Sequence, residues 1–422
     1  MAAACVAITA CAAPAPARTV DGPSAAVLAL GGLDLARDGS GAVAYLKRSR
    51  GHAHVYVSRL ADGKPQAPVR VDHGQPGSSS DVRIASADFG ETAVAWINGG
   101  RLYIALRRLE GEGFGRPVLI CDCGAGADPS LDLSIYGTGY LTFTAPGPGG
   151  HDVRVAELDD RTWKVLGASV DLNPSDDARG ARVSASGDGT GIAAFTERAP
   201  GGLWRVYERR LVRRKLSDAP LQASLGRLGG HPGRNADSPA VDLQDDSSYA
   251  WVAFRQDFKV GGHTRSRAIA RRLVGSVFDT TAEIDGLSAS SGAGAQSPVI
   301  DVTGRGHGVA ATWLTPSNGV EGAGLFQSPA SLESGGGSFP VVALNESGRG
   351  AVAWERSGAI MASYYDGRRF AKAVRISGSH AGPTAAQLGL AASASSGHYA
   401  IAFVQGSSGS RRVQVLWYAG AP

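Results

Sequence analysis

The largest concentration of side chains that could bind a ligand lies between residues 205 and 297. Arginines and histidines there flank two insertions, residues 225–239 and residues 286–297. Guanidinium groups bind anions such as carboxylates, and long loops on a rigid scaffold often carry binding sites. We therefore expect recognition of an anionic partner by the following residues: Arg209, Arg213, Arg214, His231, Arg234, Asp257, His263 and Arg271. The alternative is a solvated outer face that binds nothing.

Recognisable catalytic motifs are absent from the sequence. It contains no HExxH, no Gly-x-Ser-x-Gly, no phosphate-binding loop and no EF-hand loop. The GDGTG segment at residues 187–191 looks like part of a nucleotide loop, but it joins two expected strands instead of opening a helix. We expect no catalytic residue, no cofactor and no metal, and the sequence favours a protein that is not an enzyme.

Cys121 and Cys123 lie two residues apart in an expected outer strand. Residues at this spacing point to the same face of a strand. Three interpretations follow: a disulfide, two thiols in a weak metal site, or simple packing of the outer strand. We favour packing, because no histidine or further cysteine near them in sequence completes a zinc site.

Eight related sequence segments, each about ten residues long, indicate the scaffold that positions these candidate residues. GRGAVAW, which ends at Trp354, has seven relatives that also run from a glycine or polar turn through alternating small and β-branched residues to an aromatic. Their spacing averages about 51 residues, which indicates an internal repeat. The closing aromatics are Tyr45, Trp96, Phe143, Phe195, Phe254, Trp313, Trp354 and Phe403.

Each repeat contains signals for four short antiparallel strands. A short apolar strand precedes the phrase, and several phrases are followed by paired glycines and a third strand. Such units predict an all-β fold: an eight-bladed β-propeller of four-stranded antiparallel blades, with seven blades as the alternative. Each aromatic is then expected to pack between adjacent blades. We expect residues 25–32 to close the ring as the outer strand of the last blade.

Aspartate recurs in the short strand before the phrase, at Asp34, Asp132, Asp242 and Asp301. These carboxylates could ring a central channel that binds a cation. The favoured interpretation is a recurrent hydrogen bond between blades, because a buried carboxylate needs a partner. The candidate partners are arginines of the third strands: Arg59, Arg107, Arg108, Arg209, Arg210, Arg271 and Arg272.

The repeat resembles the degenerate propellers of exported actinobacterial proteins, lipoprotein-type propellers among them. It lacks the Trp-Asp ending of WD40 repeats, and SASGDGTGIAAF at residues 184–195 only faintly echoes a sialidase-type box. The resemblance covers residues 25–420 and implies an architecture without implying a particular site.

The amino terminus predicts export. Residues 8–11 end in Cys11 in the manner of a bacterial lipoprotein signal, and an Ala/Pro-rich stretch follows. We expect residues 1–24 to form this signal and tether, and residues 25–422 to form one propeller at the cell surface or secreted. Membrane attachment is expected only through a lipid on Cys11. The alternative is an Ala-rich tail.

Composition limits the function classes. The net charge of +4 is too small to indicate a nucleic-acid binder by itself, and 43% hydrophobic residues suffice for a core. The favoured function is an extracellular, monomeric binding or scaffolding propeller that recognises an anionic glycan, a cell-wall polymer or a protein. A carbohydrate-active hydrolase or lyase and a purely structural repeat protein are the alternatives.

Overall fold

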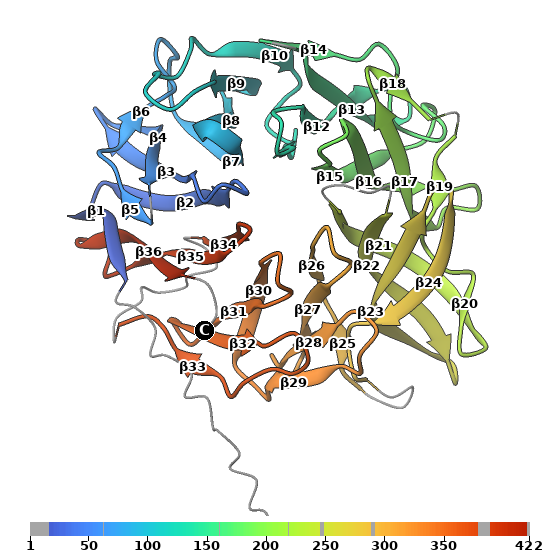
Figure 1. The fold of residues 1–422 in the computed structure, drawn as a ribbon. Coiled ribbons are helices and arrows are strands. Elements are labelled where there is room, and N and C mark those ends of the chain that lie inside the picture. The colour runs from blue at the N-terminus through green and yellow to red at the C-terminus, as the bar shows by residue number, and fades with distance from the viewer. Residues whose placement is uncertain are drawn as a thin grey trace, which may run out of the picture.

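The computed structural model describes residues 17–61, 63–159, 161–217, 219–244, 249–287, 292–378 and 389–419. These residues form eight antiparallel sheets arranged around one axis (Figure 1). Apart from the 3-10 turn η1 (Asp88–Gly90), the described elements are strands. The eight-bladed prediction is confirmed, and the seven-bladed alternative is wrong. Within the described ranges, no helix is long and apolar enough to span a membrane.

The first four blades follow one another along the chain, each with its first strand nearest the axis (Figure 1). Blade 1 contains β2 (Val27–Leu35), β3 (Gly41–Ser49), β4 (His52–Ala61), β5 (Lys64–Pro65) and β6 (Val69–Arg70). Blade 2 contains β7 (Ser79–Ala87), β8 (Glu91–Asn98), β9 (Arg101–Arg107) and β10 (Val118–Asp122). Blade 3 contains β11 (Ser130–Leu133), β12 (Gly139–Gly147), β13 (Gly150–Asp159) and β14 (Thr162–Val165). Blade 4 contains β15 (Ala178–Ala185), β16 (Thr190–Arg198), β17 (Trp204–Val212), β18 (Lys215–Leu216) and β19 (Leu221–Gln222).

The second half repeats this order. Blade 5 contains β20 (Arg227–Leu228), β21 (His231–Leu243), β22 (Tyr249–Val260), β23 (His263–Val274) and β24 (Val277–Glu283). Blade 6 contains β25 (Gly294–Ala295), β26 (Val299–Val302), β27 (Gly308–Thr315), β28 (Val320–Gly324) and β29 (Ala330–Glu333). Blade 7 contains β30 (Gly337–Leu344), β31 (Gly350–Arg356), β32 (Ala359–Tyr365) and β33 (Val374–Arg375). Blade 8 contains β34 (Leu390–Ala394), β35 (His398–Gln405), β36 (Arg411–Ala419) and β1 (Arg18–Ser24).

The ring closes through the amino-terminal strand, but not through the segment expected. β1 pairs with β36 as the outermost strand of blade 8, with Arg18 opposite Val415. Residues 27–35 instead form β2, the innermost strand of blade 1. The prediction that residues 25–32 close the ring is therefore wrong, and the propeller begins at Arg18. The shift arises because the apolar stretch can fill a two-sided inner position, whereas the more polar β1 suits the outer edge.

The repeated aromatics lie where neighbouring blades pack. Seven of the eight side chains are at most 1% exposed, and Trp313 is half-buried against Phe339 of blade 7, with ring centroids 5.0 Å apart. Trp96, for example, belongs to a cluster that also contains Val57 of blade 1. The glycine that begins the second strand has a steric role in blade 7: a Cβ at Gly350 would lie 1.8 Å from the carbonyl oxygen of Ala343 on the inner strand.

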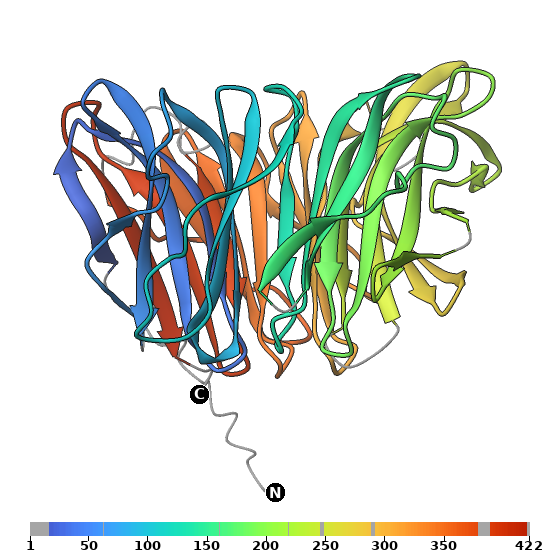
Figure 2. The ribbon, with the colours of Figure 1, turned by 90° about the horizontal axis from the view of Figure 1, so that it is seen from above.

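Each blade has two ends, which we call the entry end and the exit end. The inner strand begins at the entry end, where the hairpin between the second and third strands also lies; in blade 4, Ala178 opposes Glu197, and Arg198 opposes Trp204. The inner strand turns into the second strand at the exit end, where Ala185 opposes Gly191. Figure 2 shows the ring from the side, with strands running between these two ends.

Candidate binding sites at the channel and the entry end

The four repeated aspartates line a central cavity of about 290 Å³. Each accepts a hydrogen bond from a backbone N–H of the next blade's inner strand. The N···O distances are 2.6 Å for Ser86 to Asp34, 2.7 Å for Ala185 to Asp132, 2.6 Å for Val302 to Asp242 and 2.8 Å for Leu344 to Asp301. Ser393 Oγ also donates to Asp34, and Ser184 Oγ donates to Asp242.

The recurrent inter-blade hydrogen bond is therefore present, but its donors are not arginines. The partners of Asp34 and Asp132 are backbone N–H groups and, for Asp34, a serine hydroxyl. Asp242 has backbone N–H and serine partners and also a side-chain hydrogen bond with Asp301. Third-strand arginines bind elsewhere: Arg107 donates to Gly90 O, and Arg271 donates to Ala223 O. The prediction of Asp–Arg pairing is wrong because the inner and third strands are separated by the second strand of the same blade.

Burial away from water dominates the electrostatics of this cavity. Desolvation raises the pKa of Asp34 to about 6 and the pKa of Asp242 to about 6. Desolvation and then the charge of Asp34 raise the pKa of Asp132 well above its usual value. The carboxylates thus repel one another across the channel, while the inter-blade hydrogen bonds favour their ionised forms.

A second hollow, of about 380 Å³, lies at the entry end of blades 3, 4 and 5. We call it the entry cleft and define it by six side chains that line it: Asp128, His151, Arg179, Arg182, Trp204 and Asp237. They come from segments where inner strands begin and from the hairpins between second and third strands. Three consecutive blades therefore contribute to one site.

One wall of the entry cleft carries a histidine and a stacked pair. His151 Nδ1 lies 2.9 Å from Asp177 Oδ1, which favours the tautomer that leaves Nε2 as the acceptor. The guanidinium carbon of Arg179 lies 4.2 Å from the ring centroid of Trp204. A guanidinium group stacked on an aromatic ring still has N–H groups at its edge that can donate to an anion. The stacking also fixes the orientation of the aromatic ring.

Two separate sets of ion pairs also border the cleft. Asp128 lies 3.0 Å from Arg182 of blade 4 and 3.8 Å from Arg83 of blade 2. Asp237 lies 2.7 Å from Arg255. The Thr144 hydroxyl also borders the cleft; it is buried and has no hydrogen-bond partner among the described residues. The cleft thus offers cationic, aromatic and hydroxyl groups together.

The residues predicted as an anion site are split between the two ends of the blades. Arg213 and Arg214 follow Val212, which opposes Thr190 at the exit end of β16 and β17. His263 opposes Val260 at the entry end, near the start of β21, which carries His231 and Arg234. These two groups therefore do not share one rim, and none of them lines the entry cleft.

Several of the predicted residues have structural partners. Arg214 forms an ion pair with Asp159. Arg209 donates to the carbonyl oxygens of Ser217 and Val170, and Arg271 lies over the ring of Phe278 at 4.6 Å. Asp257 is held by Arg255 at 3.1 Å and by Ser266 at 2.5 Å. These side chains therefore contribute to contacts within and between strands, and their role in ligand binding stays a prediction.

The cleft residues carried a signal that was available in the sequence. His151 directly follows the paired glycines 149–150, and Trp204 lies two residues after the pair 201–202. Paired glycines mark the hairpins of neighbouring blades, and equivalent hairpins lie at the same end of a propeller. What the sequence did not indicate is which inner-strand residues meet these two side chains.

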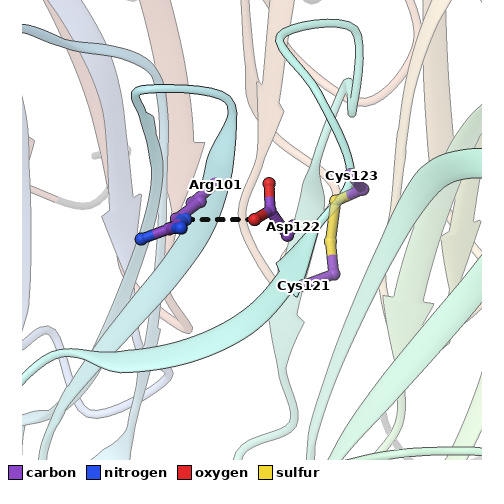
Figure 3. Close-up of a disulfide and its surroundings, with 4 residues drawn as sticks. All are labelled: Arg101, Cys121, Asp122 and Cys123. Atoms are coloured by element: carbon purple, nitrogen blue, oxygen red, sulfur yellow. Dashed lines mark hydrogen bonds and ion pairs between the residues drawn. A yellow bond between two sulfur atoms is a disulfide. The ribbon is translucent and has the colours of Figure 1, made fainter.

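Cys121 and Cys123 form a disulfide at the end of β10, with Cα atoms 5.3 Å apart (Figure 3). The favoured expectation of unbridged packing is wrong: β10 ends at Asp122, so Cys123 leaves the extended strand and its Cα comes within bridging distance of Cys121. Asp122 between them lies 3.2 Å from Arg101 of β9 (Figure 3). Cys11 lies outside the described residues. No group of three or more His, Cys, Asp or Glu side chains in the described ranges is placed to hold a metal ion.

Comparison with known proteins supports the fold and assigns no family. No family model and no curated protein matches the chain. An ulvan lyase from a new family of polysaccharide lyases matches with a TM-score of 0.50 and 11% identity, over 97% of this chain and 96% of that chain. A prolyl endopeptidase matches with a TM-score of 0.51 and 11% identity, over 91% of this chain and 55% of that chain.

A Hadza microbial sialidase also matches, with a TM-score of 0.39 and 13% identity, over 68% of this chain and 63% of that chain. The similar structures thus include carbohydrate-active enzymes. At these identities they show the propeller architecture alone.

Proposed function

We propose that this protein is an exported propeller that binds an acidic polysaccharide in the entry cleft. The observation that carries the proposal is the convergence of Arg179, Arg182 and Trp204 from blade 4 on one hollow. Guanidinium groups pair with uronate carboxylates or sulfates, and an aromatic face packs against a sugar ring. An ulvan lyase with a similar fold is an example of a propeller that acts on a polysaccharide.

The cleft suits an extended polymer better than a small enclosed molecule. It is open, it spans three blades, and its ion pairs between Asp128 and Arg182 and between Asp237 and Arg255 can also accept hydrogen bonds from sugar hydroxyls. A monomeric chain tethered through Cys11 would present such a cleft to polymers outside the cell. Export and the lipid anchor are part of this proposal.

Affinity electrophoresis through gels that contain polygalacturonate, chondroitin sulfate or neutral dextran tests the proposal. We expect retardation by an acidic polymer, weakened by salt, and none by dextran. Arg179→Ala and Trp204→Ala should each restore mobility. The matched control is Arg213→Ala, which removes an equal charge at the exit end and should leave retardation intact. Equal mobility in all gels, or loss of retardation only in the Arg213 variant, would refute the cleft assignment.

A second candidate function is cleavage of the bound polymer by β-elimination, and the His151–Asp177 pair favours it. In this reaction Nε2 of His151 removes the proton from C5 of a uronate. The C4–O4 bond breaks as the C4=C5 double bond forms, and the released oxygen takes a proton back from the histidine. Arg179 and Arg182 would neutralise the carboxylate that makes C5 acidic.

The ultraviolet absorbance of the unsaturated uronate distinguishes cleavage from binding. A lyase gives rising absorbance that His151→Ala abolishes while retardation in the gel remains. A binding protein gives retardation and no change in absorbance.

A further inference from the structure

A third hollow, of about 230 Å³, lies between blades 2 and 3 on the outer side of the ring. It is formed by β9 and the loop after it in blade 2, and by β14 and the turn before it in blade 3. In Figure 1, β10 and β14 lie side by side at the periphery. We call this hollow the outer pocket and define it by six side chains that line it: Ile104, Leu106, Arg108, Arg116, Arg161 and Trp163.

The inner side of the outer pocket is apolar. Ile104 and Leu106 are two residues apart on β9, so their side chains point to the same face of the strand. Ile104 is buried in one hydrophobic cluster with Trp163 of blade 3, and Leu106 packs against that cluster. The two blades therefore present a continuous apolar surface here, and an apolar ligand that covers it removes this surface from water.

The exposed side chains of the outer pocket are mainly cationic. Arg116 belongs to the loop between β9 and β10, and Arg161 belongs to the turn between β13 and β14. Both are exposed, and neither has a side-chain hydrogen bond or ion pair with another described residue. Arg108 is half-buried; burial raises the pKa of Glu91 to about 7, and the charge of Arg108 opposes this rise. Glu112 also lines the pocket, so three arginines share the lining with one carboxylate.

The outer pocket contains open space and an unpaired donor. Gly113 also lines the pocket, and a Cβ placed on it would have no atom within 4 Å. Trp163 is 6% exposed, and its Nε1–H has no hydrogen-bond partner among the residues that the structure describes. Because a buried donor without an acceptor costs free energy, an acceptor oxygen brought to this indole would be favourable.

We propose that the outer pocket binds a small organic carboxylate with an aromatic or branched aliphatic body. The apolar body packs against Ile104, Leu106 and Trp163, and the carboxylate accepts hydrogen bonds from Arg116 and Arg161. Guanidinium groups bind carboxylates through two parallel hydrogen bonds. The volume lies below the roughly 300–1,000 Å³ that is usual for drug-sized ligands, so the ligand is small. The competing explanation is a packing gap beneath solvated arginines that binds nothing.

The two parts of such a ligand need different parts of the outer pocket. An inorganic or very small anion uses the arginines alone, and a neutral aromatic molecule uses the apolar side alone. A ligand that carries both groups should therefore bind more tightly than either. The outer pocket shares no lining residue with the entry cleft, so this proposal does not rest on the proposed polysaccharide ligand.

Ligand-observed NMR titration of the full chain with phenylacetate, benzyl alcohol and acetate tests the proposal. We expect phenylacetate to bind roughly tenfold or more tightly than either of the other probes. Replacing both Arg116 and Arg161 with alanine should weaken phenylacetate binding roughly fivefold or more. The matched control replaces Arg213 and Arg305 with alanine, which removes the same charge from exit-end turns outside the pocket and should leave binding unchanged. Equal affinity for benzyl alcohol, no binding of phenylacetate, or equal weakening in both double variants would overturn the proposal.

Val118 offers a second test that leaves the arginines in place. It lines the outer pocket from β10 and is 44% exposed, so polar replacements there should leave the thermal midpoint nearly unchanged. Val118→Glu adds a negative charge beside the carboxylate and should weaken phenylacetate binding roughly fivefold or more, whereas Val118→Lys should bind at least as tightly as the wild type. The same affinity in both variants would contradict carboxylate recognition here. Glycan retardation is measured separately, so its failure does not bear on this result.

Discussion

The central channel and the entry cleft use similar polar residues for different purposes. In the channel, Asp34, Asp132 and Asp242 recur at repeated positions and receive their hydrogen bonds from the neighbouring blade. In the entry cleft, His151 follows a glycine hairpin, as His52 does in blade 1 and His263 does in blade 5, and Trp204 follows the equivalent hairpin of blade 4. The channel aspartates hold neighbouring blades together, whereas the cleft brings side chains of three blades together where a ligand could bind.

The largest effect expected from this comparison is on stability, in the channel. Asp242→Ala removes the acceptor for the Val302 N–H and the Ser184 hydroxyl, whereas the Leu243 N–H keeps Ser184 Oγ as an acceptor. Because each buried donor left unpaired costs about 1–3 kcal/mol, the free energy of unfolding should fall by about 3 kcal/mol. Denaturant titration measures this loss, and polysaccharide retardation of the folded fraction should be unchanged. Unaltered stability would show that the channel is not structural.

The buried channel aspartates also predict that the stability of the folded protein depends on pH. The pKa of Asp34 is about 6 in the folded protein against 3.8 for the free side chain, so the folded state holds this proton more tightly. Stability from this group is therefore complete below about pH 4 and is lost as the pH rises to about 6, on the order of 2 kcal/mol. Urea titrations across this range should show the decline, and Asp34→Asn should flatten it. A stability that rises equally in both proteins from pH 4 to 6 would contradict the assignment.

In the entry cleft, removing one polar side chain should weaken ligand binding and leave the free energy of unfolding nearly unchanged. Arg179→Ala removes an exposed guanidinium stacked on Trp204. We expect at least a tenfold weaker affinity for an acidic polysaccharide, about 1.4 kcal/mol, with a change in unfolding free energy of about 0.5 kcal/mol or less. Calorimetric titration and denaturant unfolding of the same variant separate the two quantities. A variant that unfolds easily but binds normally would reverse the roles of the two regions.

The disulfide belongs to neither region and should have the smallest effect. Cys121 and Cys123 close a loop of only a few residues, so the bridge restricts the unfolded chain little. Replacing both cysteines with serine should lower the free energy of unfolding by about 1 kcal/mol and leave glycan affinity unchanged. A loss as large as that of Asp242→Ala would mean that the bridge organises the turn into blade 3.

The sequence predicted the repeat because each blade must form the same contacts with its neighbours. Gly350 illustrates this, because the inner strand packs where a larger residue would have its Cβ atom. Trp354 is a second example, because its buried side chain fills the space between blades. The partner of Asp242 could not be predicted, because a backbone N–H is present at every residue and carries no sequence signal. The closing strand was misplaced for a related reason: β1 is polar, and only its pairing with β36 distinguishes it from a tether.

The entry cleft was missed because its residues come from three blades and are isolated in the sequence. Arg182 and Asp128 are 54 residues apart, yet they form one ion pair. The sequence instead predicted an anion site around Arg213, because adjacent charged residues are easy to recognise in a sequence. Its exit-end position emerges only from the strand register.

Hydrogen–deuterium exchange with and without an acidic polysaccharide tests most directly whether the entry cleft is the binding site. The account predicts slower exchange in peptides that cover residues 149–152, 177–182, 203–206 and 236–239, and no change at residues 213–215. Protection confined to residues 213–215, or to the exit-end turns around the channel, would contradict it.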